Sequence, residues 1–240
     1  MKLVNLDAAI IDLDGTMVDT MADFVVAINL MLQDLGLSAV DQSVVALRVG
    51  KGSENLVNSV LNHAVAQSKR GQAATDKIAT ANVVVNADHA LQLYLQHYHA
   101  VNGQYAQVYP GVMQGLADLQ KAGLKLACLT NKPTAFAQAL LKLKGLDGFF
   151  SHVFGGDSFE TKKPHPLPLL KTCAALGSAP ARTLMVGDSS NDAQAAHAAF
   201  CPVVLVTYGY NHGQPVASAG ADATIDSLAE LTSLLDQNLC

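Results

Sequence analysis

The pattern of hydrophobic and polar positions changes between the first and second halves of the chain. From about residue 105 onward, short apolar runs alternate with segments such as 111–123 and 134–145, whose apolar residues recur at helical spacing. The runs that predict buried strands occupy residues 124–130, 151–156, 183–188 and 202–209. Near-continuous apolar strands alternating with helices are typical of an α/β fold, in which helices cover both faces of a parallel sheet.

One further buried strand is predicted near the start, where residues 10–20 read IIDLDGTMVDT. The segments after it, at 21–37, 53–67 and 87–101, have amphipathic helical patterns instead. Residues 68–86 are alanine-rich and poorly patterned, which indicates a loose helix or connector with a weak strand at 83–85. The pattern therefore predicts a core of residues 1–16 and 105–240, interrupted by a helical insert of residues 17–104 that could fold over the end of the first strand.

Composition narrows the class of protein. The chain has 240 residues, of which half are hydrophobic, so it can form a substantial core. Its net charge of −5, with scattered Lys and Arg, argues against a nucleic-acid partner. We expect no membrane partner, because no apolar run approaches the roughly 20 residues that cross a bilayer and the start lacks a signal-peptide pattern. The sequence does not indicate an oligomeric state.

Cysteine usage suggests the compartment. The four cysteines show neither close pairing nor zinc-ligand spacing; they are Cys128, Cys173, Cys201 and Cys240. Such cysteines are typical of free thiols in a reducing environment, so we expect a cytoplasmic location.

Polar side chains follow several of the predicted strands. They are Asp12 and Asp14 after the first strand, Thr130 and Asn131 after the second, Asp188 and Asp192 near the fourth, and Lys162 and Lys163 on a loop. Ligands of an open parallel sheet bind beyond the carboxyl ends of its strands, so we expect these side chains to meet. Two carboxylates about 4 Å apart repel by roughly 4 kcal/mol at an effective dielectric of about 20, which calls for a compensating cation.

A metal ion would supply that compensation. The carboxylates of Asp12, Asp14 and Asp188 suit Mg²⁺, which prefers oxygen ligands and often completes its shell with a phosphate. A phosphoryl group at this edge would meet Mg²⁺, a lysine and a threonine hydroxyl, the electrostatic clamp that phosphoryl transfer needs. The sequence therefore predicts a magnesium-dependent site for a small phosphorylated metabolite.

Four motifs carry a resemblance to a known family. DLDGT (12–16), LTNKP (129–133), KKPHPLP (162–168) and GDSSND (187–192) are similar, in order and spacing, to the four signatures of the haloacid dehalogenase-like hydrolases. The helical insert resembles the cap domain of that superfamily. The resemblance implies a Rossmann-like core with an inserted cap. Within the superfamily, LTNKPTAF, GGDSFETKKPHPLPLL and TYGYNHG most resemble phosphoglycolate phosphatases.

The resemblance implies roles for the residues of the first motif and the lysine loop. Asp12 would be the nucleophile that forms an aspartyl-phosphate. Asp14 would be the general acid and base, with its backbone carbonyl as a Mg²⁺ ligand. Lys163, rather than Lys162, would neutralise charge on the nucleophile and the phosphoryl group.

The remaining motifs have implied roles of their own. Thr130 and the backbone of Asn131 would hold phosphate oxygens. Asp188 would bind Mg²⁺, whereas Asp192 would act on the metal indirectly or orient Lys163.

Two positions depart from the family pattern. Ile11 stands where an aromatic residue is usual, and either side chain fills a buried strand. Phe200 stands where a glycine usually ends a helix, and a left-handed conformation there would cost roughly 1 kcal/mol.

The segment GKGS (50–53) has two interpretations. It lacks the spacing of a phosphate-binding P-loop. It is either a simple loop before a helix of the insert, or a specificity loop on which Arg48 or Lys51 meets a substrate carboxylate.

The predicted function is hydrolysis of a small phosphomonoester, with 2-phosphoglycolate as the expected substrate and glycolate and phosphate as products. Alternatives within the superfamily are a phosphatase for another metabolite, a phosphomutase and a pyrophosphatase. A dehalogenase is disfavoured, because a halide leaves without a proton and needs no acid at Asp14. Outside enzymes, a phospho-accepting receiver domain would be about half as long, and a silent binding module would not need every motif side chain.

Overall fold

The computed structural model describes residues 5–72 and 86–235. Its strands are β1 (Ala8–Ile11), β2 (Val18–Asp19), β3 (Gln107–Val108), β4 (Lys125–Leu129), β5 (His152–Phe154), β6 (Thr183–Gly187), β7 (Val203–Val206) and β8 (Ala223–Ile225). Its helices are α1 (Met21–Asp34), α2 (Gln42–Ala46), α3 (Ser53–Gln72), α4 (Ala87–Val101), α5 (Val112–Lys121), α6 (Thr134–Leu143), α7 (Leu167–Leu176), α8 (Ser190–Ala199) and α9 (Leu231–Leu234).

Six strands form a parallel sheet in the order β5-β4-β1-β6-β7-β8. The chain runs outward from β1 through β4 to β5, and then fills the other side with β6, β7 and β8. Strand order therefore reverses at β1, and in open α/β sheets this reversal leaves a crevice at the carboxyl ends. The prediction of an α/β fold with a parallel sheet is confirmed. The short edge strand β8 was not predicted, because its three residues form no apolar run.

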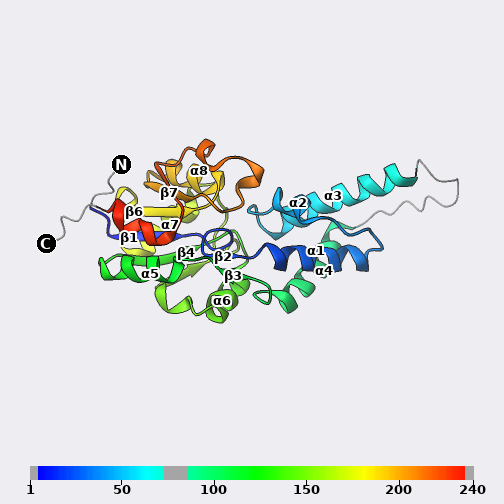
Figure 1. Cartoon of the computed structure of the whole chain (residues 1–240), viewed down its shortest axis with the longest axis horizontal. Helices are drawn as coiled ribbons and strands as arrows, with labels where there is room; N and C mark the ends of the chain where they lie inside the picture. Colours follow the sequence, from blue (N-terminus) through cyan, green and yellow to red (C-terminus); the bar gives the residue numbers. More distant parts are fainter. Residues whose placement is uncertain (1–4, 73–85, 236–240) are drawn as a thin grey trace.

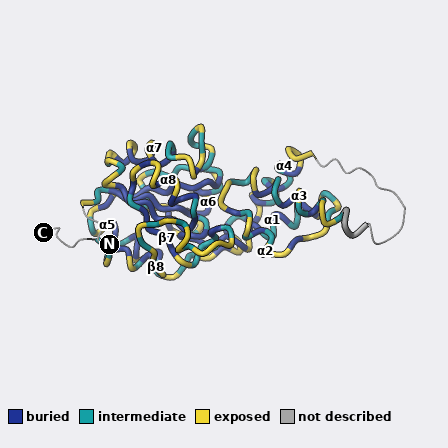
Figure 2. The backbone as a smooth tube through the Cα atoms, turned by 90° about the horizontal axis from the view of Figure 1, so that it is seen from above, coloured by how far each residue is buried: buried dark blue, intermediate teal, exposed yellow. Residues whose placement is uncertain are grey.

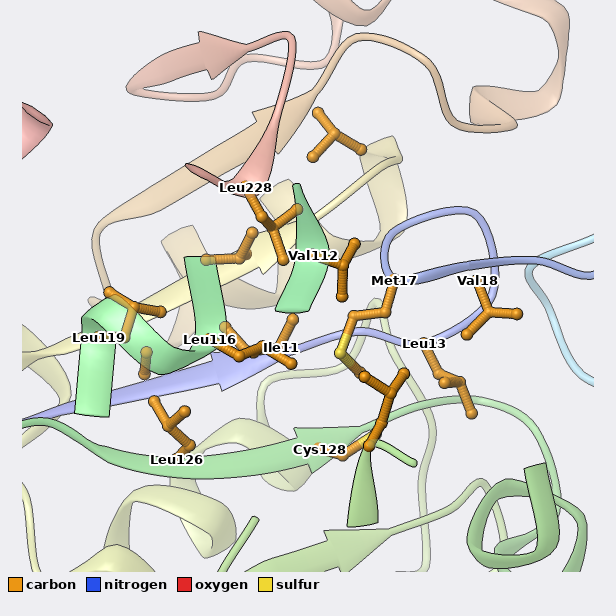
Figure 3. Close-up of a cluster of buried hydrophobic side chains, with 14 of the residues drawn as sticks. Ile11, Leu13, Met17, Val18, Val112, Leu116, Leu119, Leu126, Cys128 and Leu228 are labelled. Carbon is orange, nitrogen blue, oxygen red and sulfur yellow. The ribbon is translucent and has the colours of Figure 1, made fainter. Parts of the chain in front are cut away.

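Helices cover both faces of this sheet, because its strands are apolar on both sides. In β1, Ala9 and Ile11 belong to a hydrophobic cluster shared with α5 and α6, whereas Ala8 and Ile10 face a cluster shared with α7 and α8. This alternation follows the two-residue period of a strand. Figure 3 shows Ile11 packing with Leu116 of α5 in the first cluster. The strands accordingly form a buried centre in Figure 2.

Helices α1 to α4 lie beyond one end of the sheet (Figure 1). They enclose a hydrophobic cluster of their own, which contains Phe24, Met31, Val57 and Tyr94. Helices α1, α3 and α4 match the predicted helical segments, and the short α2 was not predicted. Helix α3 continues to residue 72, into the segment 68–86 that was predicted to be a loose helix or connector. The weak strand predicted at residues 83–85 lies outside the described residues. The boundaries of the helical insert at residues 17 and 104 stay a prediction.

Two chain segments connect the helical insert to the sheet, and they are bound to each other. Strands β2 and β3 form a short antiparallel ribbon across the two segments. The buried carboxylate of Asp23, in α1, accepts hydrogen bonds from the backbone N–H groups of Gly103 and Tyr105 at 2.6 and 2.8 Å. Burial raises the pKa of Asp23. The first turn of α1 is therefore fastened to the segment that follows α4.

None of the helices in residues 5–72 and 86–235 has the length and hydropathy that crossing a membrane requires.

Phe200 ends α8 in the left-handed conformation (φ 60°, ψ 32°), and its side chain is 82% exposed. We expect Phe200→Gly to raise the free energy of unfolding by about 1 kcal/mol, because glycine adopts this conformation without a Cβ clash. Phe200→Val should lower it, since a β-branched residue is strained there. Urea unfolding of both variants measures the effect. Equal stabilities of the Gly and Val variants would show that backbone conformation does not limit stability here.

Candidate active site

The strands bring the predicted site residues to one edge of the sheet. Asp12 follows β1, Thr130 follows β4 and Asp188 follows β6. The pairing of β1 with both neighbours sets Ile11 level with Cys128 and Val186, so the three strand ends lie side by side. One cavity is lined by seven of the predicted residues: Asp12, Asp14, Thr130, Asn131, Lys163, Asp188 and Asp192.

Lys163 is the central cation of this cavity. Its Nζ lies 2.9 Å from Asp12 Oδ1 and 2.7 Å from Asp192 Oδ1, and it donates to the carbonyl of Leu129 at 2.8 Å. Burial alone would lower the pKa of Lys163, but Asp12 and Asp192 together raise it above its usual value. Lys163 is therefore held as a buried ammonium. The exposed Lys162 does not line the cavity.

The carboxylates around Lys163 outnumber it. Burial raises the pKa of Asp12 to about 7, although Lys163 opposes the shift. Burial, with the charges of Asp192 and Asp12, raises the pKa of Asp188 well above its usual range. One carboxylate oxygen from each of these three aspartates lies within 4.8 Å of the others. This buried excess of negative charge fits a divalent metal ion bound by oxygen ligands.

Asp192 differs from the other two carboxylates because protein donors already occupy its oxygens. Its Oδ2 accepts from the Ser189 hydroxyl at 2.9 Å and from the Ser189 N–H at 3.2 Å, a capping box at the start of α8, and its Oδ1 faces Lys163. Gly187 makes room for this arrangement, since a Cβ there would lie 2.3 Å from Asp192 Cγ. Asp188 instead receives one hydrogen bond, at 2.7 Å, from the backbone N–H of Tyr210.

Asp14 is paired with a different lysine. Its Oδ1 accepts from the Thr20 hydroxyl at 2.8 Å and from Lys132 Nζ at 3.0 Å. Gly15 supplies the turn after it with φ +83°, and a Cβ there would lie 2.2 Å from Asp188 Oδ2. The two carboxylates of the first motif therefore each lie beside their own lysine, which offsets the repulsion expected from their spacing.

Lys132 is a site residue that the sequence analysis missed. Its ammonium donates to the Tyr98 hydroxyl and lies 4.6 Å from the ring centroid of Tyr98 and 4.9 Å from that of Phe24. The available signal was its position directly after Thr130 and Asn131 in LTNKP. Its partners were not predictable, because they come from α1 and α4 of the helical insert, far away along the chain.

The specificity-loop interpretation of GKGS needs correction for its side chains. Arg48 Nη1 donates to the carbonyl of Val44 at 2.6 Å, so its guanidinium turns back to the preceding helix α2. Neither Arg48 nor the exposed Lys51 lines the cavity. The loop does reach the cavity, but through Gly50, whose carbonyl accepts from Asn131 Nδ2 at 2.9 Å.

Asn131 also fixes the lysine loop with its side chain. Its Oδ1 accepts from the Lys163 N–H at 3.0 Å, and its Nδ2 donates to the Lys163 carbonyl at 2.8 Å. Only its backbone was expected to have a role. The amide therefore joins three segments that are distant in sequence.

Comparison with known proteins identifies the family of the chain. A family model described as haloacid dehalogenase-like hydrolase matches residues 6–199. The chain belongs to this family. The hydrolase is 43% identical to a plasmid phosphoglycolate phosphatase of Cupriavidus necator over 228 residues, which cover 95% of this chain and 92% of the relative. It is 38% identical to a phosphoglycolate phosphatase of Thiobacillus denitrificans, with 94% and 93% covered.

One solved structure is similar to the hydrolase over nearly its whole length. The crystal structure of a predicted phosphoglycolate phosphatase from Haemophilus somnus superposes with a TM-score of 0.86 at 32% identity, covering 96% of this chain and 98% of the other. These matches confirm the resemblance to the superfamily and to its phosphoglycolate phosphatases, and they confirm the fold.

The burial of Lys163 among carboxylates predicts a large effect on stability. Lys163→Met should lower the free energy of unfolding of the hydrolase by about 3–5 kcal/mol, because it leaves buried carboxylates without their cation. Lys162→Met, which removes the same charge from an exposed neighbour, should change it by less than about 0.5 kcal/mol. Urea unfolding in metal-free buffer compares the two. Equal losses would mean that Lys163 does not stabilise the carboxylate cluster.

Proposed function

We propose that this hydrolase is a magnesium-dependent phosphatase that converts 2-phosphoglycolate to glycolate and phosphate. The observation that carries the proposal is the arrangement of Asp12 and Asp14, which line one cavity beside separate lysines. The names of the relatives support the substrate, since the two described above are phosphoglycolate phosphatases that match nearly the whole chain.

Asp12 is the nucleophile in this proposal. Its carboxylate oxygen attacks phosphorus, the bond between phosphorus and the ester oxygen breaks, and an aspartyl-phosphate forms. Asp14 donates a proton to the departing glycolate oxygen. Asp14 then accepts a proton from water as that water attacks phosphorus, which releases phosphate and restores Asp12. Both steps need a carboxyl group two residues past the nucleophile, as the motif provides.

Other residues hold the phosphoryl group in place. The ammonium of Lys163, fixed by Asp192, neutralises charge on Asp12 and on the phosphoryl oxygens. The Thr130 hydroxyl and the backbone N–H of Asn131 bind phosphate oxygens at the end of β4. Asn131 contributes further through its side chain, which keeps the Lys163 loop in position.

The carboxylates of Asp12 and Asp188, with the backbone carbonyl of Asp14, would hold Mg²⁺. When bound, the ion supplies positive charge that stabilises the phosphoryl oxygens in the transition state. Asp192 acts by orienting Lys163, because its own oxygens already accept hydrogen bonds from the protein.

The helical insert acts as a cap over this site. Phe24, Ser53 and Tyr94 from the insert line the same cavity as the carboxylates. Closing such a cap excludes bulk water and brings its side chains to the part of the substrate that carries no phosphate. Gly15 and Gly103, both with positive φ, lie on the two connecting segments and could absorb the backbone rotation.

A panel of phosphorylated metabolites tests the proposed activity. We expect phosphate release with the highest kcat/KM for 2-phosphoglycolate, and lower values for sugar phosphates and pyrophosphate. Asp12→Asn should leave no detectable turnover, because unaided ester hydrolysis is extremely slow and enzymatic accelerations reach up to ~10²¹. The exposed Asp147→Asn variant is the matched control and should stay active. Better turnover of another panel member would reject the substrate, and an active Asp12→Asn would reject the nucleophile.

Removing the metal tests the cofactor. A chelator should abolish phosphate release, and added Mg²⁺ should restore it. Ca²⁺ should substitute poorly, because it favours more ligands and a looser geometry. Asp188→Asn should need a higher Mg²⁺ concentration for half-maximal activity. Full activity in metal-free buffer would contradict a role for Mg²⁺ at these carboxylates.

A further inference from the structure

Within residues 5–72 and 86–235, the cavity is lined by two lysines and by no arginine. They are Lys132 and Lys163. Lys163 is bound by Asp12, Asp192 and the carbonyl of Leu129. Its ammonium donates to Asp192 Oδ1 and to the Leu129 carbonyl, and its charge lies beside Asp12. A second anionic group on a substrate needs an N–H donor away from this carboxylate cluster.

Lys132 has such a donor. Its side chain is only 2% exposed, and two of its N–H groups reach Asp14 Oδ1 and the Tyr98 hydroxyl. The third N–H has no acceptor in the part of the chain that the structure describes. The rings of Phe24 and Tyr98 hold the ammonium through cation–π contacts and keep water away from it. A buried, partly unsatisfied cation of this kind binds an incoming anion strongly.

The position of Lys132 relative to Asp14 indicates which part of a substrate it would meet. Asp14 is the acid that protonates the ester oxygen in the proposed function, and Lys132 Nζ lies 3.0 Å from its carboxylate. Lys132 is thus on the leaving-group side of the site. In a phosphorylated 2-hydroxy acid unit, the carboxylate carbon is two bonds from the ester oxygen. A carboxylate so close to that oxygen can reach a cation beside Asp14.

We propose that Lys132 binds the carboxylate of the substrate, and that Tyr98 and Phe24 of the helical insert position its ammonium. The inference rests on the proposed function and makes it more specific. The residue that selects the substrate then lies on the loop after β4, next to Asp14. The substrate class is a phosphomonoester with a carboxylate two bonds from the ester oxygen. The aromatic side chains of Phe24, Tyr94 and Tyr98 line the same cavity.

Two matched pairs of compounds test this assignment in the full-length protein with Mg²⁺. The substrates are 2-phosphoglycolate and ethyl phosphate, which lacks the carboxylate. The non-hydrolysable ligands are 3-phosphonopropionate and propylphosphonate, whose binding calorimetry measures without turnover. In Lys132→Met, the preference for the carboxylate-bearing member should fall about 10- to 100-fold in both kcat/KM and Kd, as expected for a lost charged hydrogen bond. Lys51→Met is the matched control, and its preference should stay at the wild-type value.

The possible outcomes differ in the ratio of kcat/KM, or of Kd, between the compound with the carboxylate and the compound without it. Equal losses for both members in Lys132→Met would mean that Lys132 acts only through Asp14, and would overturn the inference. Loss of preference in Lys51→Met instead would assign the carboxylate to the loop of the insert and would also overturn it. Failure of the proposed function is visible in the wild type alone, as absent turnover of 2-phosphoglycolate. The calorimetric pair then still decides whether Lys132 binds a carboxylate.

A second variant covers the case in which Lys132→Met does not fold. Tyr98→Phe keeps the ring under the ammonium and removes only the hydroxyl that accepts from it. The same preference should fall about 2- to 10-fold, because one hydrogen bond that positions Lys132 is lost. An unchanged preference in Tyr98→Phe would show that the hydroxyl does not position the ammonium.

Discussion

The structure depends on burying several carboxylates at one edge of a parallel sheet. Asp12, Asp188 and Asp192 lie close enough to share a metal ion, yet burial raises the pKa of both Asp12 and Asp188. Such a cluster is stable only where cations and N–H donors surround it. The lysine loop, the capping box of α8 and the Tyr210 segment each supply one of these partners. The loops beyond the strand ends are therefore fixed by electrostatics as well as by packing.

The same requirement connects the two parts of the chain. Asp14 needs its own cation, and Lys132, which provides it, needs an environment that holds an ammonium away from water. The sheet cannot offer that environment at its edge, and the rings of Phe24 and Tyr98 from the helical insert supply it. The contact between insert and sheet thus passes through the acid of the proposed mechanism. An insert in another position would leave Lys132 hydrated and would weaken each hydrogen bond that it makes.

Features that depend on residues close in sequence could be predicted, whereas contacts between side chains far apart in sequence could not. Strand and helix patterns are local, so β1, β4, β6 and the helices α1, α3 and α4 were predictable, as was the meeting of Asp12 and Asp188 at parallel strand ends. The strand β8 was missed because three residues give too little pattern. The pairing of Lys132 with Tyr98 joins side chains from different parts of the fold, and no local pattern reports such a contact. Arg48 does not line the cavity and instead donates to the nearby carbonyl of Val44, a contact that the sequence pattern did not reveal.

The separation of the two lysines has a chemical consequence for the first motif. In the proposed mechanism, Asp12 must be ionised when it attacks phosphorus and Asp14 must carry a proton when it acts as the acid, so the two carboxylates need surroundings that can change separately. With Lys163 beside Asp12 and Lys132 beside Asp14, an incoming group can change the surroundings of one carboxylate without changing those of the other. Lys163 is fixed by Asp192 and the carbonyl of Leu129, whereas Lys132 is fixed mainly by the insert. In the proposed mechanism, the surroundings of Asp14 are therefore the ones that substrate binding and the position of the helical insert can adjust.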